Sequence, residues 1–182
     1  MLDMSVAYNR YRFIGNEFLT WLWFVVATNS YSIYLNNDAD DGSSQLTPTI
    51  SLGDRIALKN RHDQGEETIT ITGSGADWEE GAVALKKGAQ VNELALVFEQ
   101  DQHTWKATLK GESLHLTGLK TPQGGKIYAP EETEAAVLEK FYLYDQIVQW
   151  INQLFDAFVG LRVSDQWESG QLPEVRRWIH VS

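Results

Sequence analysis

The sequence predicts an α+β fold: an antiparallel sheet of about five to six strands, packed by an N-terminal apolar helix, a short middle helix and a long C-terminal helix. Three observations predict it. Residues 16–27 are apolar and rich in aromatics, residues 49–119 contain several stretches of period-two alternation, and residues 130–162 carry apolar side chains at heptad spacing.

Composition and charge limit the classes of function. The 182 residues are 43% hydrophobic and 22% charged, which is typical of one globular domain spanning residues 1–182. Cysteine is absent, which excludes disulfides, thiol nucleophiles and thiolate metal sites, and we expect a cytoplasmic location. The net charge of −10 opposes indiscriminate binding of polyanions unless positive side chains gather on one face.

The apolar run of residues 16–27 predicts a buried helix, because its apolar side chains cover nearly the whole helical circumference. We expect Asn16 to cap this helix and Glu17 to lie in its first turn. A cleaved secretory signal is the alternative, with Val25–Ala27 as its cleavage site. The acidic residue and bulky tryptophans favour the buried helix, and the run is too short to cross a bilayer.

A polar loop without periodicity is predicted at residues 36–46. Its acidic run resembles a calcium-binding loop. Aligning Gly42 with the glycine of such a loop places Ala39 and Pro48 where oxygen ligands belong, so a calcium site is excluded.

Period-two alternation predicts the strands. They cover residues 49–52, 54–60, 66–72, 93–99, 103–110 and 113–119. Residues 62–65 predict one hairpin loop, and Gly111-Glu112 predicts a two-residue turn that sets His115 opposite Ala107. Between the two groups of strands, a short helix is expected to begin at Asp77 and to end at Gly88.

The longest predicted helix covers residues 130–162, and a C-terminal tail helix follows over residues 165–180. Apolar residues spaced alternately four and three apart form a seam along the long helix. The seam consists of Val137, Phe141, Tyr144, Val148, Ile151, Phe155 and Phe158. Both a core helix lying across the sheet and a dimer seam agree with this pattern.

Catalytic constellations are missing from the sequence. No two of the four histidines are spaced as metal ligands on one helix, so we expect neither a metal site nor a cofactor. The Gly73-Ser74-Gly75 segment resembles part of a dinucleotide fingerprint, but Trp78 stands where its third glycine belongs. We therefore expect no enzyme activity.

Strand alternation predicts a basic outer face on the sheet. Ile56 and Leu58 share the inward face of one strand, and the side chains between them point outward. The predicted DNA-binding side chains are Arg55, Lys59, Arg61, Lys106 and Lys110. We expect such a face to bind a DNA phosphate backbone despite the net charge of the chain. The alternative is an ordinary solvent-exposed sheet face with scattered lysines and arginines.

The order of motifs resembles the recombination-associated protein RdgC family. The resemblance is carried by residues 13–24 (FIGNEFLTWLWF), residues 77–85 (DWEEGAVAL), residues 86–88, residues 93–98 and the helix end at residues 155–158. It implies a cytoplasmic, nucleoid-associated homodimer that encloses double-stranded DNA without sequence preference and restrains recombination. It brings no catalytic residues.

Two functional hypotheses follow. The first is a non-enzymatic RdgC-like protein that binds double-stranded DNA weakly and in a salt-sensitive way, and modulates recombination. The second is an acidic protein-interaction or homodimerisation module with no nucleic-acid role, which uses the aromatic seam. An exported protein is a third alternative.

Overall fold

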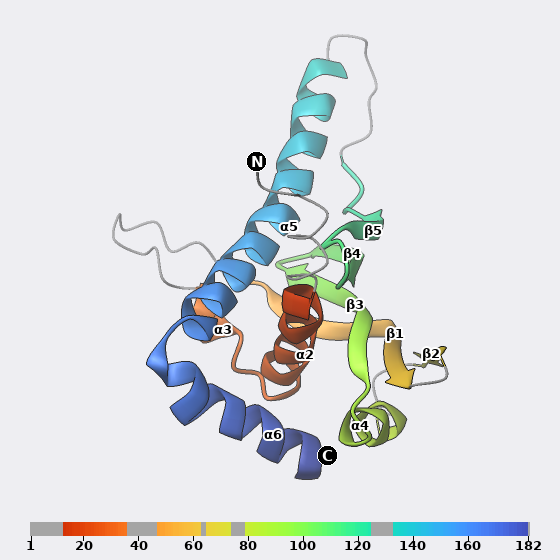
Figure 1. The fold of residues 1–182 in the computed structure, drawn as a ribbon. Coiled ribbons are helices and arrows are strands. Elements are labelled where there is room, and N and C mark those ends of the chain that lie inside the picture. The colour runs from red at the N-terminus through yellow and green to blue at the C-terminus, as the bar shows by residue number, and fades with distance from the viewer. Residues whose placement is uncertain (1–12, 36–46, 63–64, 74–78, 125–132, 182) are drawn as a thin grey trace, which may run out of the picture.

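A five-stranded antiparallel sheet forms the centre of the fold, with strand order β2-β1-β3-β4-β5, so the α+β prediction is confirmed (Figure 1). The computed structural model describes residues 13–35, 47–62, 65–73, 79–124 and 133–181. The strands are β1 (Thr49–His62), β2 (Gly65–Thr72), β3 (Gln90–Gln100), β4 (His103–Lys110) and β5 (Leu116–Lys120). The predicted loop at residues 36–46 and the predicted cap at Asp77 lie outside these ranges.

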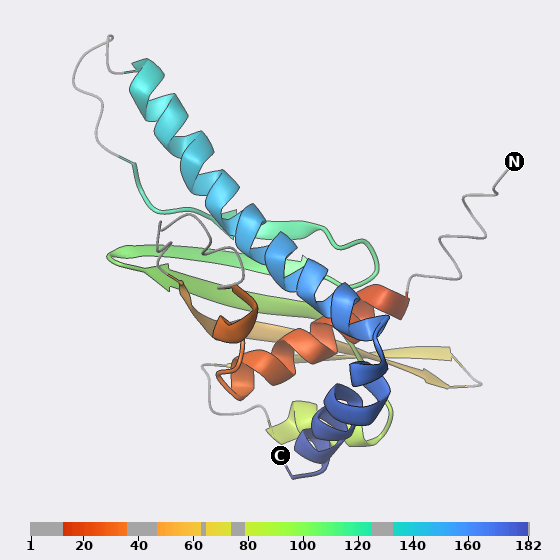
Figure 2. The same ribbon diagram turned by 90° about the vertical axis from the view of Figure 1, so that its left-hand side faces the viewer.

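The helices lie on one side of the sheet (Figure 2). They are α2 (Phe13–Ala27), α3 (Ser32–Leu35), α4 (Glu79–Lys86), α5 (Thr133–Arg162), a π-helical segment η2 (Trp167–Gln171) and α6 (Leu172–Val181). Against the opposite face, called the outer face below, no helix of the described ranges packs. The sheet therefore has one face in the core and one available to solvent.

The inward side chains follow the predicted alternation. Ile56 and Leu58 on β1, and Leu94 and Phe98 on β3, are all fully buried. On β4, Trp105 is buried, while the side chains between the inward positions point outward. The predicted alternation of inward and outward side chains on β1, β3 and β4 is therefore confirmed.

The aromatic-rich helix α2 is buried on nearly every side. Phe18, Trp21 and Trp23 are each at most 2% exposed, and every side chain from Trp21 to Val26 is buried. The helix begins at Phe13, however, so Asn16 lies inside it instead of capping it. Its Nδ2 donates a hydrogen bond to Gln90 Oε1 on β3 at 3.2 Å. The cap prediction is wrong because α2 starts earlier than the polar residues suggest.

Close contact between two glycines holds α2 against the loop after β4. A Cβ added to Gly15 would meet the backbone of Gly111, and Gly111 donates a hydrogen bond to the carbonyl of Asn92 on β3 at 2.7 Å. Gly111 is therefore fixed from two sides.

The second hairpin consequently differs from the prediction. Lys110 donates to the carbonyl of His115 at 3.0 Å, so the loop between the strands covers residues 111–115. Thr108 then pairs with Thr117, and His115 does not face Ala107. Leu114 adopts a positive φ of 53° within this loop. The two-residue turn is wrong. At the first hairpin, by contrast, the chain reverses within the predicted residues 62–65, where His62 pairs with Gly65.

Helix α4 ends as predicted. Gly88 has a φ of +90°, and Ala89 donates to the carbonyl of Ala84 at 3.0 Å, while Gly88 donates to that of Leu85. These bonds form a Schellman motif, in which a residue with positive φ satisfies the last helical carbonyls.

Helix α5 crosses the sheet and is tied to it near its middle. The indole nitrogen of Trp105 donates to the carbonyl of Leu143 at 2.7 Å, and Trp150 stacks on Phe98 at 5.8 Å between ring centroids. At 30 residues the helix is about 45 Å long. Its N-terminal part consequently extends beyond β4 and β5 (Figure 1).

Candidate functional site

Three of the predicted DNA-binding side chains gather on the outer face. Arg55, Lys59 and Lys110 line one depression of about 390 Å³, together with Glu93 and Glu112. The side chain of Arg61 lies outside the described part of the structure, although its backbone is in β1.

Acidic neighbours compensate these cations. Glu93 contacts both Arg55, at 3.3 Å, and Lys110, at 3.5 Å. Lys59 contacts Glu112 and Glu66, each at 2.7 Å. The hydrogen bond to Glu112, and then the one to Glu66, raise the pKa of Lys59. The charges are therefore largely balanced, so this depression is a poor attractor for a phosphate backbone.

Lys106 lies apart from that network. It pairs with Lys120 across β4 and β5, and both lysines line a groove of about 570 Å³, which the small residues Gly53 and Ala95 and the acidic Asp54 also line. Within the described residues, neither lysine takes part in an ion pair. Sequence reasoning missed Lys120 because the predicted register of β5 was wrong.

The seam of α5 divides into a covered half and an exposed half. Phe158 is fully buried, and Phe155 packs edge-on against Phe18 of α2 at 5.1 Å. Ile151 is also buried, and Val148 is partly buried. The C-terminal half of the seam is therefore core, with α2 packed against it.

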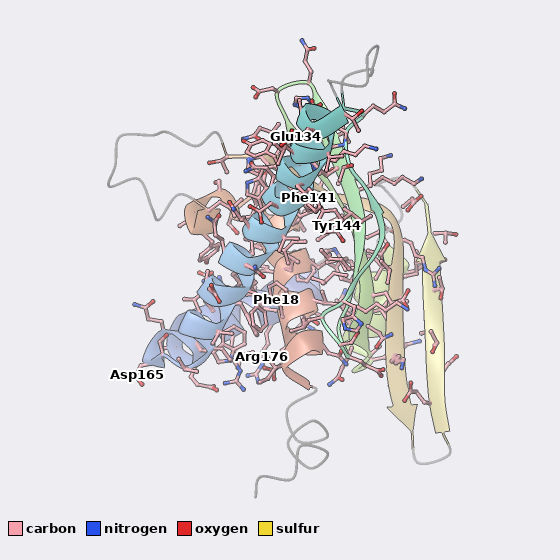
Figure 3. All side chains as sticks on the ribbon, turned by 90° about the horizontal axis from the view of Figure 1, so that it is seen from above. Phe18, Glu134, Phe141, Tyr144, Asp165 and Arg176 are labelled. Atoms are coloured by element: carbon pink, nitrogen blue, oxygen red, sulfur yellow. The ribbon has the colours of Figure 1, made fainter. Side chains whose placement is uncertain are left out.

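The N-terminal half of the seam is exposed. We define the α5 patch as the large apolar side chains in the N-terminal part of α5, on the seam and beside it, that are exposed to solvent. It consists of Val137 (46% exposed), Leu138 (62%), Phe141 (69%), Tyr142 (62%) and Tyr144 (52%). Figure 3 labels Phe141 and Tyr144 on this part of α5, and Phe18 on α2 farther along it. Large apolar side chains exposed together in this way are typical of an interaction site.

Two opposite charges flank the exposed half of the seam. Lys140 and Asp145 lie on opposite edges of the seam, because they precede Phe141 and follow Tyr144, respectively. Both residues are exposed. One oxygen of Asp145 accepts a hydrogen bond from Gln149 at 2.6 Å, which leaves its other oxygen for a further partner.

The described residues contain neither a metal-binding cluster nor a membrane-spanning helix. Among the described residues, no group of histidine, aspartate and glutamate side chains is arranged to hold a metal ion. Across the same ranges, no helix has the length and apolarity needed to cross a membrane.

Comparison with known proteins gives no relative. No protein-family model, no curated protein and no solved structure matches this chain. Function therefore has to be inferred from the surfaces described above.

Proposed function

We propose that this chain is a non-enzymatic association module, and that the α5 patch binds the same patch of a second copy. The exposure of five large apolar side chains on one overhanging stretch of α5 carries the proposal. Two copies of the patch would bury roughly 1,000 Å², which is about the lower limit for a specific interface. The core anchors α5 at Leu143, beside the C-terminal end of the patch, so pairing extends from a turn that is already fixed. A cytoplasmic location belongs to the same proposal.

Charge complementarity favours a parallel pair. Lys140 occupies a g position and Asp145 the e position of the next heptad, when Phe141 is at a and Tyr144 at d. In a parallel two-fold pair, each g side chain faces the following e side chain of the partner. Each Lys140 would then meet Asp145 of the second copy, whereas an antiparallel pair would set like edges against each other.

Charge exchange at these two positions tests the proposal. We expect Lys140→Glu to raise the dimer Kd about tenfold, because two facing ion pairs become repulsive. The double variant Lys140→Glu with Asp145→Lys is expected to recover wild-type affinity. Sedimentation equilibrium measures the Kd of each variant.

Phe141→Glu is the companion variant. It places a charge in the centre of the patch, and we expect it to raise the Kd at least about a hundredfold. A wild-type protein that sediments as a monomer at all concentrations contradicts the proposal. A dimer that Phe141→Glu disrupts, but that the double charge variant does not restore, contradicts the parallel arrangement alone.

A second candidate function is non-specific binding of double-stranded DNA, as in the RdgC-like hypothesis with its role in recombination at the nucleoid. The pairing of Lys106 with Lys120 favours it, because neither lysine takes part in an ion pair among the described residues, although Asp54 lines the same groove. Arg55, Lys59 and Lys110 contribute less because Glu93, Glu66 and Glu112 neutralise them.

Retention of a labelled duplex tests this second candidate. We expect binding at ~50 mM salt that weakens steeply as salt rises, and its loss in the variant Lys106→Glu with Lys120→Glu. The variant Lys86→Glu with Lys87→Glu on and beside α4 changes the net charge equally and is the matched control. Absence of retention at ~50 mM salt, or equal loss in both variants, contradicts DNA binding by this groove.

A further inference from the structure

The edge of β2 that faces away from β1 carries backbone groups that can form further hydrogen bonds. This strand pairs with β1 on one side, and on its other side the described residues supply no strand. The β1–β2 hairpin also extends past the start of β3, because the last β1 residue that pairs with β3 is Lys59, whereas β1 pairs with β2 as far as His62. The edge is therefore accessible over several residues.

The hydrogen-bond pattern identifies which backbone groups point outward. His62 pairs with Gly65 at the hairpin turn, and Gly73 donates to the carbonyl of Asp54 at 3.1 Å. Residues that bond to the neighbouring strand alternate with residues that do not, so the odd-numbered residues of β2 bond to β1. The N–H and C=O groups of Thr68, Thr70 and Thr72 consequently point to the free edge.

The usual protections of an edge strand are missing from this stretch. Residues 68–72 (TITIT) contain no charge and no proline, and their pairing with β1 continues without a bulge. Proline, lysine and bulges are the devices by which proteins prevent the addition of another strand. By contrast, β1 is bulged where it pairs with β3. The β2 edge is therefore competent for strand addition.

Side-chain alternation specifies what the added strand must look like. On the core side it would lie beside Ile69, which is half-buried, and Ile71, which is buried. On the outer side it would lie beside threonines. A strand that fits needs apolar and β-branched polar residues in alternation, and β2 itself has that sequence.

We infer that β2 pairs with β2 of a second copy, antiparallel and about a two-fold axis at Thr70. In this register Thr70 faces Thr70 of the partner copy, and Thr68 faces Thr72. Ile69 then lies beside Ile71 of the partner copy and extends the apolar face of both sheets. Two five-stranded sheets become one continuous sheet. This contact does not depend on the α5 patch.

Amide hydrogen exchange as a function of protein concentration tests the inference. The protein is studied with the Phe141→Glu substitution, so that association through the α5 patch does not contribute. We expect the amides of Thr68, Thr70 and Thr72 to exchange at least about tenfold more slowly in the associated state. Those of Ile69 and Ile71 are expected to be protected at every concentration, because they already bond to β1.

Proline substitution provides the matched pair of variants. Thr70→Pro removes an outward N–H, which edge strands tolerate, and is expected to raise the Kd for this contact at least about tenfold with the monomer still folded. Ile69→Pro removes an N–H that bonds to β1, and it is expected to disrupt the β1–β2 hairpin itself. Thr70→Lys keeps the backbone intact and sets two like charges opposite each other, so it replaces the proline variant should that variant fail to fold.

Three results would overturn the inference. One is rapid exchange of the three threonine amides at all concentrations. Another is their protection in a protein that sediments as a monomer, which would identify an intramolecular occupant. The third is an associated state whose Kd neither Thr70→Pro nor Thr70→Lys changes, which would assign the contact to another surface or to an unrelated extended peptide.

Discussion

Replacing Gly15 with alanine is expected to lower the free energy of unfolding by about 2–3 kcal/mol, the usual cost of overpacking. A Cβ at this position would overlap the carbonyl oxygen of Gly111, which is a backbone atom and cannot rotate away. Gly111 is also fixed by its hydrogen bond to Asn92. Helix α2 or the loop after β4 therefore has to shift, and the contact between them is lost.

Gly160 provides the matched control for this prediction. It also lies in a helix, α5, but a Cβ added there would have no atom within 4 Å. Gly160→Ala is expected to raise the free energy of unfolding by roughly 0.5–1 kcal/mol, because alanine loses less backbone entropy on folding. Urea unfolding of both variants measures the two effects. Unchanged stability of the Gly15 variant would show that α2 does not approach the loop so closely.

The second large effect is expected at Phe158, where substitution by alanine should cost about 3–5 kcal/mol. The ring is fully buried and lies 5.5 Å from Phe18, 5.6 Å from Trp21 and 5.6 Å from Trp167, measured between centroids. These rings belong to α2 and η2, so the cavity would open where three helical segments meet. Thermal and urea unfolding both report the loss.

Phe141→Ala makes the same chemical change on the same helix. Because the Phe141 ring is 69% exposed, we expect its removal to alter monomer stability by less than about 0.5 kcal/mol. The measurement is made at low protein concentration, where association does not contribute. Equal losses at Phe141 and Phe158 would contradict the division of the seam into an exposed and a covered half.

Much of the fold is predictable because the signals are local. Alternation along β3 identifies Leu94 and Phe98 as inward side chains, and the glycine at position 88 identifies the end of α4, where the structure gives it a positive φ. The all-round apolarity of residues 16–27 identifies a buried helix. Each of these inferences depends only on residues that are close together in the sequence.

The misplaced features depend on contacts between distant segments. The loop after β4 is longer than predicted because Gly111 is held by Gly15 and Asn92, which are remote in sequence. Asn16 lies inside α2, next to Gln90, for the same reason. Local propensity favours a tight turn and a cap at these positions, and tertiary packing overrides both preferences.

The candidate surfaces, too, can be predicted only in part from the sequence. Alternation places Arg55, Lys59 and Lys110 on one face, but only the strand register brings Glu93 between Arg55 and Lys110. The heptad seam is likewise visible in the sequence, whereas its division into a core half and the α5 patch depends on how far α2 reaches. A pattern identifies which residues share a face, and packing decides what covers them.

The hydrogen bond from Trp105 to Leu143 has a consequence for the energetics of α5. Residues after this point are bound into the core, so they open only when the core itself opens. The first turns, from Thr133 to Tyr142, are almost entirely exposed, and none of their side chains belongs to the buried core of the described residues. One continuous helix thus contains two cooperative units, and Leu143 marks the boundary between local fraying and global unfolding.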